Sequence, residues 1–201
     1  MLANITILRM NSLLSAALIK IVISMALYFI AFLPTNYYPD LLRNNEYSTF
    51  FYLPTGMKVL CVLLFDIWGA IGVAIGVFIR QSLQHPGLSF SFPLSLAFES
   101  LFVFWVTVKV SLKLMGVGRE IQNITYIKIV GIALMCSVLH GFSYAFVLLE
   151  FSLISPADYF RESLFTAMSG LFGTMAIVLL LSLAFKHSLW LQKQVRAIEN
   201  D

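Results

Sequence analysis

The stretch that decides the fold runs from Phe51 to Gly76 and reads FYLPTGMKVLCVLLFDIWGAIGVAIG. It is almost wholly apolar, yet it contains a proline, a lysine, an aspartate and several glycines. The two arms around the aspartate are each predominantly apolar, although each is slightly shorter than the about 20 residues of a typical membrane helix. The stretch therefore predicts a tight helical hairpin in a membrane, with Asp66 as the N-cap of its second helix.

The whole chain has the composition of a polytopic membrane protein. Of its 201 residues, 60% are hydrophobic and 11% are charged, whereas soluble domains carry roughly 25% charged residues. We predict an all-α bundle of six transmembrane helices over residues 13–33, 50–65, 67–82, 93–115, 126–149 and 159–185. The net charge of +3 is small and scattered. The sequence therefore disfavours nucleic-acid binding, and the expected partner is the lipid bilayer.

The distribution of positive charge predicts the orientation in the membrane, because Lys and Arg concentrate in cytoplasmic loops. With the N-terminus inside, the cytoplasmic ends collect Arg9, Lys20, Lys109, Lys113, Arg119, Lys128, Lys186, Lys193 and Arg196. The outer loops hold Arg43, Arg80 and Arg161. We therefore predict a multi-pass protein of the bacterial inner membrane with both termini cytoplasmic. Residues 1–186 form the transmembrane domain, and residues 187–201 form a short cytoplasmic or interfacial tail.

Three ionisable residues on different predicted helices lie at a similar depth in the outer half of the membrane. They are Lys58, Glu99 and His140. Ionisable residues inside spans usually face the bundle interior and pair with one another. We therefore expect Lys58 and Glu99 to pair, with His140 nearby.

This polar layer has two interpretations. It specifies packing alone, or it lines a ligand-binding pocket that is open to the outside. In the second interpretation the other wall residues are Tyr52, Thr55, Trp105, Ser143 and Tyr144.

Small residues on the predicted third helix indicate close helix packing. Gly69, Gly72 and Gly76 share nearly one face, and the last two form a GxxxG pair that favours packing within the bundle over dimerisation. The two cysteines, Cys61 and Cys136, lie in apolar runs and are expected to be buried free thiols. We find no phosphate-binding loop, metal-ligand motif or nucleophile motif. The sequence therefore predicts no catalytic residues, no metal, no cofactor and no enzymatic activity.

The element YLPTG, followed by an apolar helix and a glycine-containing helix, resembles the opening of the MASE1 family of integral membrane sensor domains. The segment FPLSLAFESLFVFWVTVKVSLKLMG resembles that family's helix with a glutamate, and SGLFGTMAIVLLLSLAF resembles its last helix. The resemblance covers about residues 50–185 and implies a sensor. The family's domains usually have more than six spans and are joined to a cytoplasmic output domain. This chain therefore resembles a stand-alone relative that lacks the output domain.

Three functions remain open from the sequence. The first is a sensor-like or ligand-binding protein that signals to, or works with, a separate protein partner in the membrane or at the cytoplasmic face. The second is a substrate-binding subunit of a small-molecule importer, because six short spans also resemble the S-components of energy-coupling-factor transporters. The third is an accessory subunit of a larger membrane complex. The first two require a polar pocket for a small-molecule ligand, whereas the third predicts a packed interior.

Overall fold

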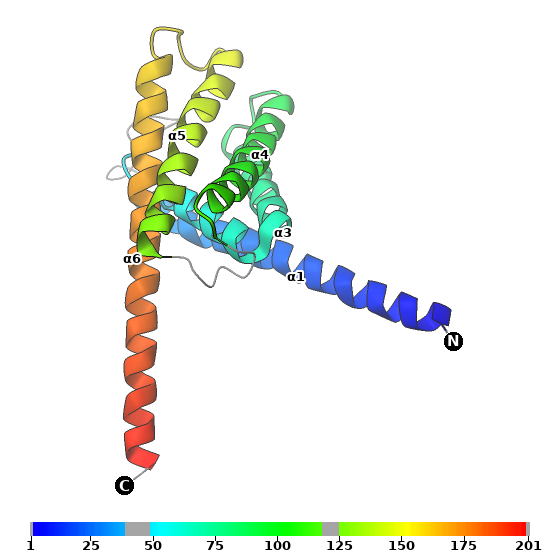
Figure 1. Cartoon of the computed structure of the whole chain (residues 1–201). Coiled ribbons are helices and arrows are strands. Elements are labelled where there is room, and N and C mark those ends of the chain that lie inside the picture. The colour runs from blue at the N-terminus through cyan, green and yellow to red at the C-terminus, as the bar shows by residue number, and fades with distance from the viewer. Residues whose placement is uncertain (1, 39–48, 118–124, 200–201) are drawn as a thin grey trace.

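The structure is a computed structural model that describes residues 2–38, 49–117 and 125–199, with the side chains of residues 14–38, 49–117 and 125–183. Helices dominate these residues (Figure 1). They are α1 (Leu2–Tyr37), α3 (Leu53–Gln84), α4 (Ser91–Leu114), α5 (Tyr126–Glu150) and α6 (Tyr159–Glu199). The predicted all-α class is confirmed.

Among the described residues there are five candidate membrane helices, and the predicted number of six is wrong. Five segments are long and apolar enough to cross a membrane: Leu14–Tyr37, Leu53–Gln84, Ser91–Leu114, Tyr126–Glu150 and Tyr159–Leu183. The predicted second and third spans belong to one element, α3, which is interrupted at Asp66. The arm before this break covers residues 53–65, which is much shorter than the about 20 residues that a bilayer core requires. It therefore does not count as a span of its own.

The chain reverses its direction inside α3. Asp66 has φ 56° and ψ −136°, a backbone conformation outside the helical region. Just beyond it, a methyl group added to Gly69 would overlap the carbonyl oxygen of Cys61, on the other side of the break. In a straight helix these residues would lie about 12 Å apart along the axis. The two arms therefore fold back on each other, which brings both ends of α3 to the same end of the bundle.

Close contact with α1 fixes the second arm of α3. A Cβ atom on Gly72 would overlap the carbonyl oxygen of Ile21, and one on Gly76 would lie 2.8 Å from the Tyr28 ring. Both positions are thus restricted to glycine by the approach of a neighbouring helix, as in other small-residue packing motifs. From Gly72 to Gly76, the contact on α1 moves from Ile21 and Ser24 to Tyr28. Both chains therefore advance in the same direction, and this arm runs parallel to α1.

The arrangement of the helices brings several helix ends together at one end of the bundle. Helix α3 contacts every other described helix, and α5 packs along α6 (Figure 1). Because α3 begins and ends at the same side, the end of α1, both ends of α3, the beginning of α4 and the α5–α6 connection lie there. The Asp66 turn, the end of α4 and the beginning of α5 lie at the opposite end. The first part of α1 and the last part of α6 extend away from the bundle (Figure 1).

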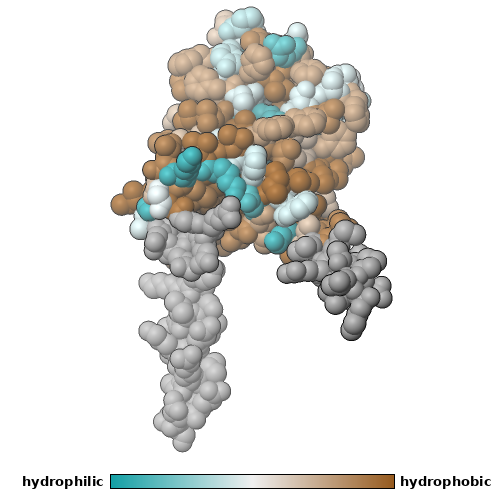
Figure 2. All heavy atoms as spheres, turned by 45° about the vertical axis from the view of Figure 1, so that its right-hand side comes forward, coloured by the Kyte–Doolittle hydropathy of each residue, from teal (hydrophilic) through white to brown (hydrophobic). Residues whose placement is uncertain are grey.

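The outer surface is that of an integral membrane protein. Figure 2 shows a face that is predominantly hydrophobic, with sparse hydrophilic residues. Large apolar side chains point outward from α4 and α6, including Phe98 at 52%, Phe102 at 55% and Leu179 at 60% exposure. Lipid is the solvent that accommodates such a surface, because exposed apolar patches of this extent are rare on soluble monomers. The protein is thus a multi-pass helical membrane protein.

The predicted orientation and tail are only partly covered by the described residues. Helix α6 continues through the predicted tail as far as Glu199. Residues 200 and 201 lie outside the described residues, as do Arg43 and Arg119. The side chains of Arg9, Lys186, Lys193 and Arg196 lie outside the described side chains. The cytoplasmic location of the termini therefore stays a prediction.

Candidate functional site: a polar cavity between the helices

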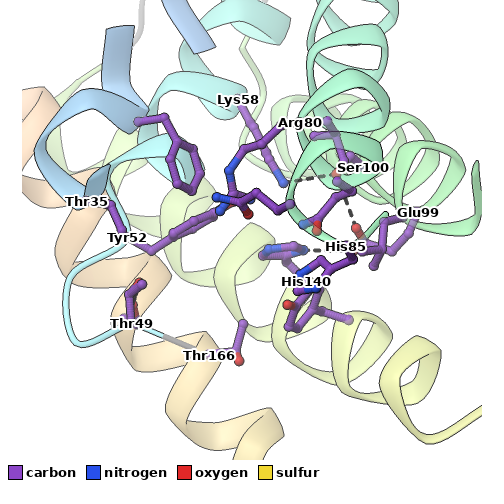
Figure 3. Close-up of a pocket in the computed structure, with 17 residues that line it drawn as sticks. Thr35, Thr49, Tyr52, Lys58, Arg80, His85, Glu99, Ser100, His140 and Thr166 are labelled. Atoms are coloured by element: carbon purple, nitrogen blue, oxygen red, sulfur yellow. Dashed lines mark hydrogen bonds and ion pairs between the residues drawn. The ribbon is translucent and has the colours of Figure 1, made fainter. Parts of the chain in front are cut away.

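A cavity of about 360 Å³ lies between the helices, towards the end of the bundle at which α3 begins and ends. Figure 3 shows it in close-up. Its volume falls within the range of small-molecule sites, roughly 300–1,000 Å³. All five described helices contribute to its wall. The polar lining residues are Thr35, Thr49, Tyr52, Lys58, Arg80, Gln81, Gln84, His85, Glu99, Ser100, His140, Tyr144, Thr166 and Ser169, and the apolar ones are Phe32, Val77 and Leu96.

A buried carboxylate organises one wall of the cavity. Glu99 lies on α4, and its Oε1 is 2.7 Å from Nδ1 of His140 on α5. Ser143, one turn further along α5, donates to the same oxygen at 2.6 Å. Ser100 donates to Oε2 at 3.3 Å. The Glu99 and His140 side chains are only 5% and 3% exposed. Such short contacts are typical of charge-assisted hydrogen bonds, which fix both side chains in place.

Lys58 joins this network through a hydroxyl group. Its Nζ donates to Ser100 Oγ at 2.9 Å, and Ser100 in turn donates to Glu99 (Figure 3). The ammonium lies 5.0 Å from the centroid of the Phe104 ring and 5.8 Å from that of Tyr52, so both rings provide cation–π contacts. The expected pairing of Lys58 with Glu99 is indirect, because the hydroxyl of Ser100 lies between them. The expected proximity of His140 is confirmed.

Arg80 is a cavity residue that the sequence analysis placed in an outer loop. Its guanidinium carbon lies 3.3 Å from the centroid of the Phe32 ring on α1, which indicates stacking. The sequence does carry a signal for this position. Gly72, Gly76 and Arg80 follow one another at intervals of four residues, so they share one helix face. Since the two glycines contact α1, Arg80 must also face α1.

The other predicted wall residues divide into two groups. Tyr52 and Tyr144 line the cavity, and the Tyr52 ring stacks near His140 with centroids 6.5 Å apart. Ser143 supports Glu99 from behind without lining the cavity. Thr55 is buried close to Gly170 of α6. These two residues help to shape the site, but neither forms its wall.

Trp105 lies at the opposite end of the bundle. Its Nε1 donates to Asp66 Oδ1 at 2.9 Å, and Lys109 donates to Oδ2 of the same carboxylate at 2.6 Å. Asp66 therefore ties the turn of α3 to α4, instead of serving simply as the N-cap that the sequence predicts. Trp105 does not line the cavity, because α4 runs from the cavity end to this turn and Trp105 lies more than halfway along it.

The arrangement favours binding over nucleophilic chemistry. Ser143 and His140 contact the same oxygen of Glu99, so the serine hydroxyl is directed to the carboxylate and not to the imidazole as a general base requires. Within the described side chains, no group of three or more His, Cys, Asp or Glu residues has an arrangement that could hold a metal ion. The site offers two cations, two imidazoles, several hydroxyls and amides, and one carboxylate to a ligand.

The predicted resemblance to MASE1 domains has no independent support. The chain matches no family model, no curated protein and no solved structure. On the evidence of its surface and of the five candidate membrane helices in the described part of the chain, this is a polytopic membrane protein.

Proposed function

We propose that this protein binds a small polar molecule in the cavity between its helices. The observation that carries the proposal is the composition of the cavity wall. Lys58, Glu99 and His140 are at most 9% exposed, and they line a cavity of about 360 Å³ inside the helical bundle. Ionisable groups at such positions are costly in a membrane and usually mark a functional site.

The cavity favours a ligand-binding role over that of an accessory subunit. A subunit without a ligand of its own has no need of a polar cavity and would be more stable with an apolar, packed interior. Here the wall is built from five helices that each supply polar side chains. The protein binds its ligand and does not transform it, in keeping with the absence of catalytic motifs from the sequence.

Within this role, a sensor-like protein is favoured over the importer subunit. The importer interpretation used the glycine-rich face of the third predicted helix to dock an energising partner. Gly72 and Gly76 are instead covered by α1. We propose that the cavity opens to the outside of the bacterial inner membrane, and that a separate protein partner reads the ligand-bound state at the other end of the bundle.

The first test is to identify what the protein retains. The protein is purified from its native membrane in mild detergent, and bound small molecules are extracted and identified by mass spectrometry. The comparison variant is Thr166→Phe, which fills the cavity from α6. The matched control is Met168→Phe on the same helix, where the side chain is 58% exposed.

We expect a molecule that is retained by the wild type and by Met168→Phe and is lost from Thr166→Phe. The proposal fails if no molecule depends on the cavity and a protein co-purifies in stoichiometric amount. The protein would then be an accessory subunit, and the polar wall would be a packing feature.

A further inference from the structure

The wall of the cavity carries more positive than negative charge. Lys58 and Arg80 are the strong cations among the described lining residues, and Glu99 is the one carboxylate. Both oxygens of Glu99 already accept hydrogen bonds, from Ser143 and Ser100, and one of them is also paired with His140. Glu99 therefore offers little acceptor capacity to a ligand. One positive charge of the lining is left without a counter-charge in the wall, even when both imidazoles are neutral.

Glu162 is the nearest acidic residue of α6 to these side chains and lies outside the lining. One oxygen of its carboxylate is 3.8 Å from Arg161. An uncompensated cation inside a membrane protein is strongly unfavourable, because the low dielectric constant deprives it of hydration. A bound anion would remove this cost.

Arg80 is oriented in a way that suits a flat oxyanion. Its guanidinium carbon lies 3.3 Å from the centroid of the Phe32 ring, and stacking at this distance leaves the edge of the group for hydrogen bonds. Its Nε–H is buried and has no hydrogen-bond partner among the described residues. A guanidinium edge binds carboxylate or phosphate oxygens with two parallel hydrogen bonds.

Two hydroxyls in the lining also lack partners. Thr35 Oγ1 on α1 and Thr166 Oγ1 on α6 are buried without a hydrogen-bond partner in the described part of the chain. The two residues are 1% and 9% exposed. Buried polar atoms are almost always hydrogen-bonded in native proteins, so unpartnered donors around a cavity indicate a missing acceptor. Lys58 adds further donors, since an ammonium has three and Ser100 takes one of them.

From these observations we propose that the ligand carries an oxyanion, a carboxylate or a phosphate, which lies between Lys58 and Arg80. This inference rests on the proposed ligand-binding function and narrows it to a chemical class. A small metabolite or a lipid headgroup can supply such a group. Thr49, Gln84 and His85 are only partly buried, and they mark the side of the cavity through which the group enters.

The test compares ligands that differ only in charge. Purified protein is placed in nanodiscs of phosphatidylcholine, and thermal unfolding is followed with hexanoate, hexanamide and hexylamine, and with glycerol 3-phosphate and glycerol. We expect at least one of the two anions to raise the unfolding temperature in a concentration-dependent manner, because a ligand that binds the folded state stabilises it. The uncharged and cationic analogues should give no shift.

Variants then assign the anion to the cavity. Arg80→Gln should weaken binding at least tenfold, whereas Lys109→Gln, which removes a half-exposed cation at the opposite end of the bundle, should bind as the wild type does. Lys58→Arg keeps the positive charge and should retain binding. It serves as the second variant if Arg80→Gln does not fold.

A parallel preparation in nanodiscs that contain phosphatidylglycerol distinguishes a lipid headgroup from a small metabolite as the source of the oxyanion. If the shift arises there without a soluble anion and is lost in Arg80→Gln, the oxyanion belongs to a lipid headgroup. The proposal is overturned if the amide or the amine binds as well as the anion, if Arg80→Gln binds the anion like the wild type, or if neither anion changes the unfolding temperature in either lipid. Binding of the uncharged analogues would contradict the oxyanion but leave the proposed ligand-binding function standing. If no compound changes the unfolding temperature and no molecule is retained from the native membrane, both the oxyanion and the ligand-binding function are contradicted.

Discussion

Replacing Glu99 by glutamine should destabilise the protein although it changes the shape of the side chain very little. The carboxylate takes part in two contacts of 2.6 and 2.7 Å and one of 3.3 Å. Hydrogen bonds to charged groups contribute about 1.5–3 kcal/mol each, against about 0.5–1.5 kcal/mol for neutral ones. Converting the two short contacts from charged to neutral should therefore cost about 2–3 kcal/mol. Glu99→Ala, which leaves the partners without any acceptor, should cost about 3–5 kcal/mol.

The physical cause can be isolated with a double-mutant cycle. Lys58 is linked to the Glu99 carboxylate by hydrogen bonds through Ser100. Glu99→Gln removes this nearby negative charge, so part of the loss in unfolding free energy comes from the uncompensated Lys58 cation. Lys58→Met removes that cation and keeps an unbranched apolar chain. The double variant should therefore lose less unfolding free energy than the two single variants lose together. The difference should be about 1 kcal/mol or more, as expected for coupled neighbours.

The assay is the free energy of unfolding, measured by titration with sodium dodecyl sulfate in mixed micelles without added ligand. The matched control is Ser91→Ala, since Ser91 is exposed at the start of α4 and bonds only to the neighbouring Ser89 hydroxyl. It should change the stability by less than about 0.5 kcal/mol. Wild-type stability of Glu99→Gln, or strictly additive effects in the cycle, would refute the reasoning.

The remaining predictions concern the architecture. Asp66→Gly relieves a backbone strain of about 1–3 kcal/mol that Asp66→Ala retains, while both lose the same hydrogen bonds. The glycine variant should therefore melt at the higher temperature, and the reverse order would contradict a strained turn. Gly72→Ala should cost about 1–3 kcal/mol by overpacking against α1, whereas Gly87→Ala, with open space around it, should be neutral in the same unfolding assay. In intact cells, cysteine at Ser89 should react with an impermeant maleimide and cysteine at Lys128 only after permeabilisation, and equal reactivity would contradict the predicted orientation.

The sequence was sufficient to predict the class of protein and the gathering of Lys58, Glu99 and His140. Apolar runs of membrane length and ionisable residues at matched depth are strong signals, because hydrocarbon tolerates few alternatives. The reversal at Asp66 was also visible, because a charged residue interrupts an apolar stretch. The number of membrane helices could not be predicted from the sequence, because the arm before Asp66 is too short to span a bilayer and joins the next arm in one element.

The composition of the cavity wall was harder to predict. Arg80 was assigned to a loop because charge alone was considered, although its spacing from Gly72 and Gly76 places it on the face toward α1. Trp105 was included in the cavity wall although it lies 12 residues, or about 18 Å, beyond the start of the predicted helix at residue 93, which already places it in the other half of the bundle. The interposed hydroxyl of Ser100 had no sequence signal, since it depends on the rotation of α4 relative to α3.

The most direct test of the account is an experimental structure of the protein purified gently from its native membrane, at a resolution that shows small ligands. The account predicts density for an oxyanion in the cavity, within hydrogen-bond distance of Lys58 Nζ and the guanidinium of Arg80. It also predicts that Glu99 remains on His140. A cavity filled with ordered water alone, or closed by Arg80 paired directly with Glu99, would contradict it.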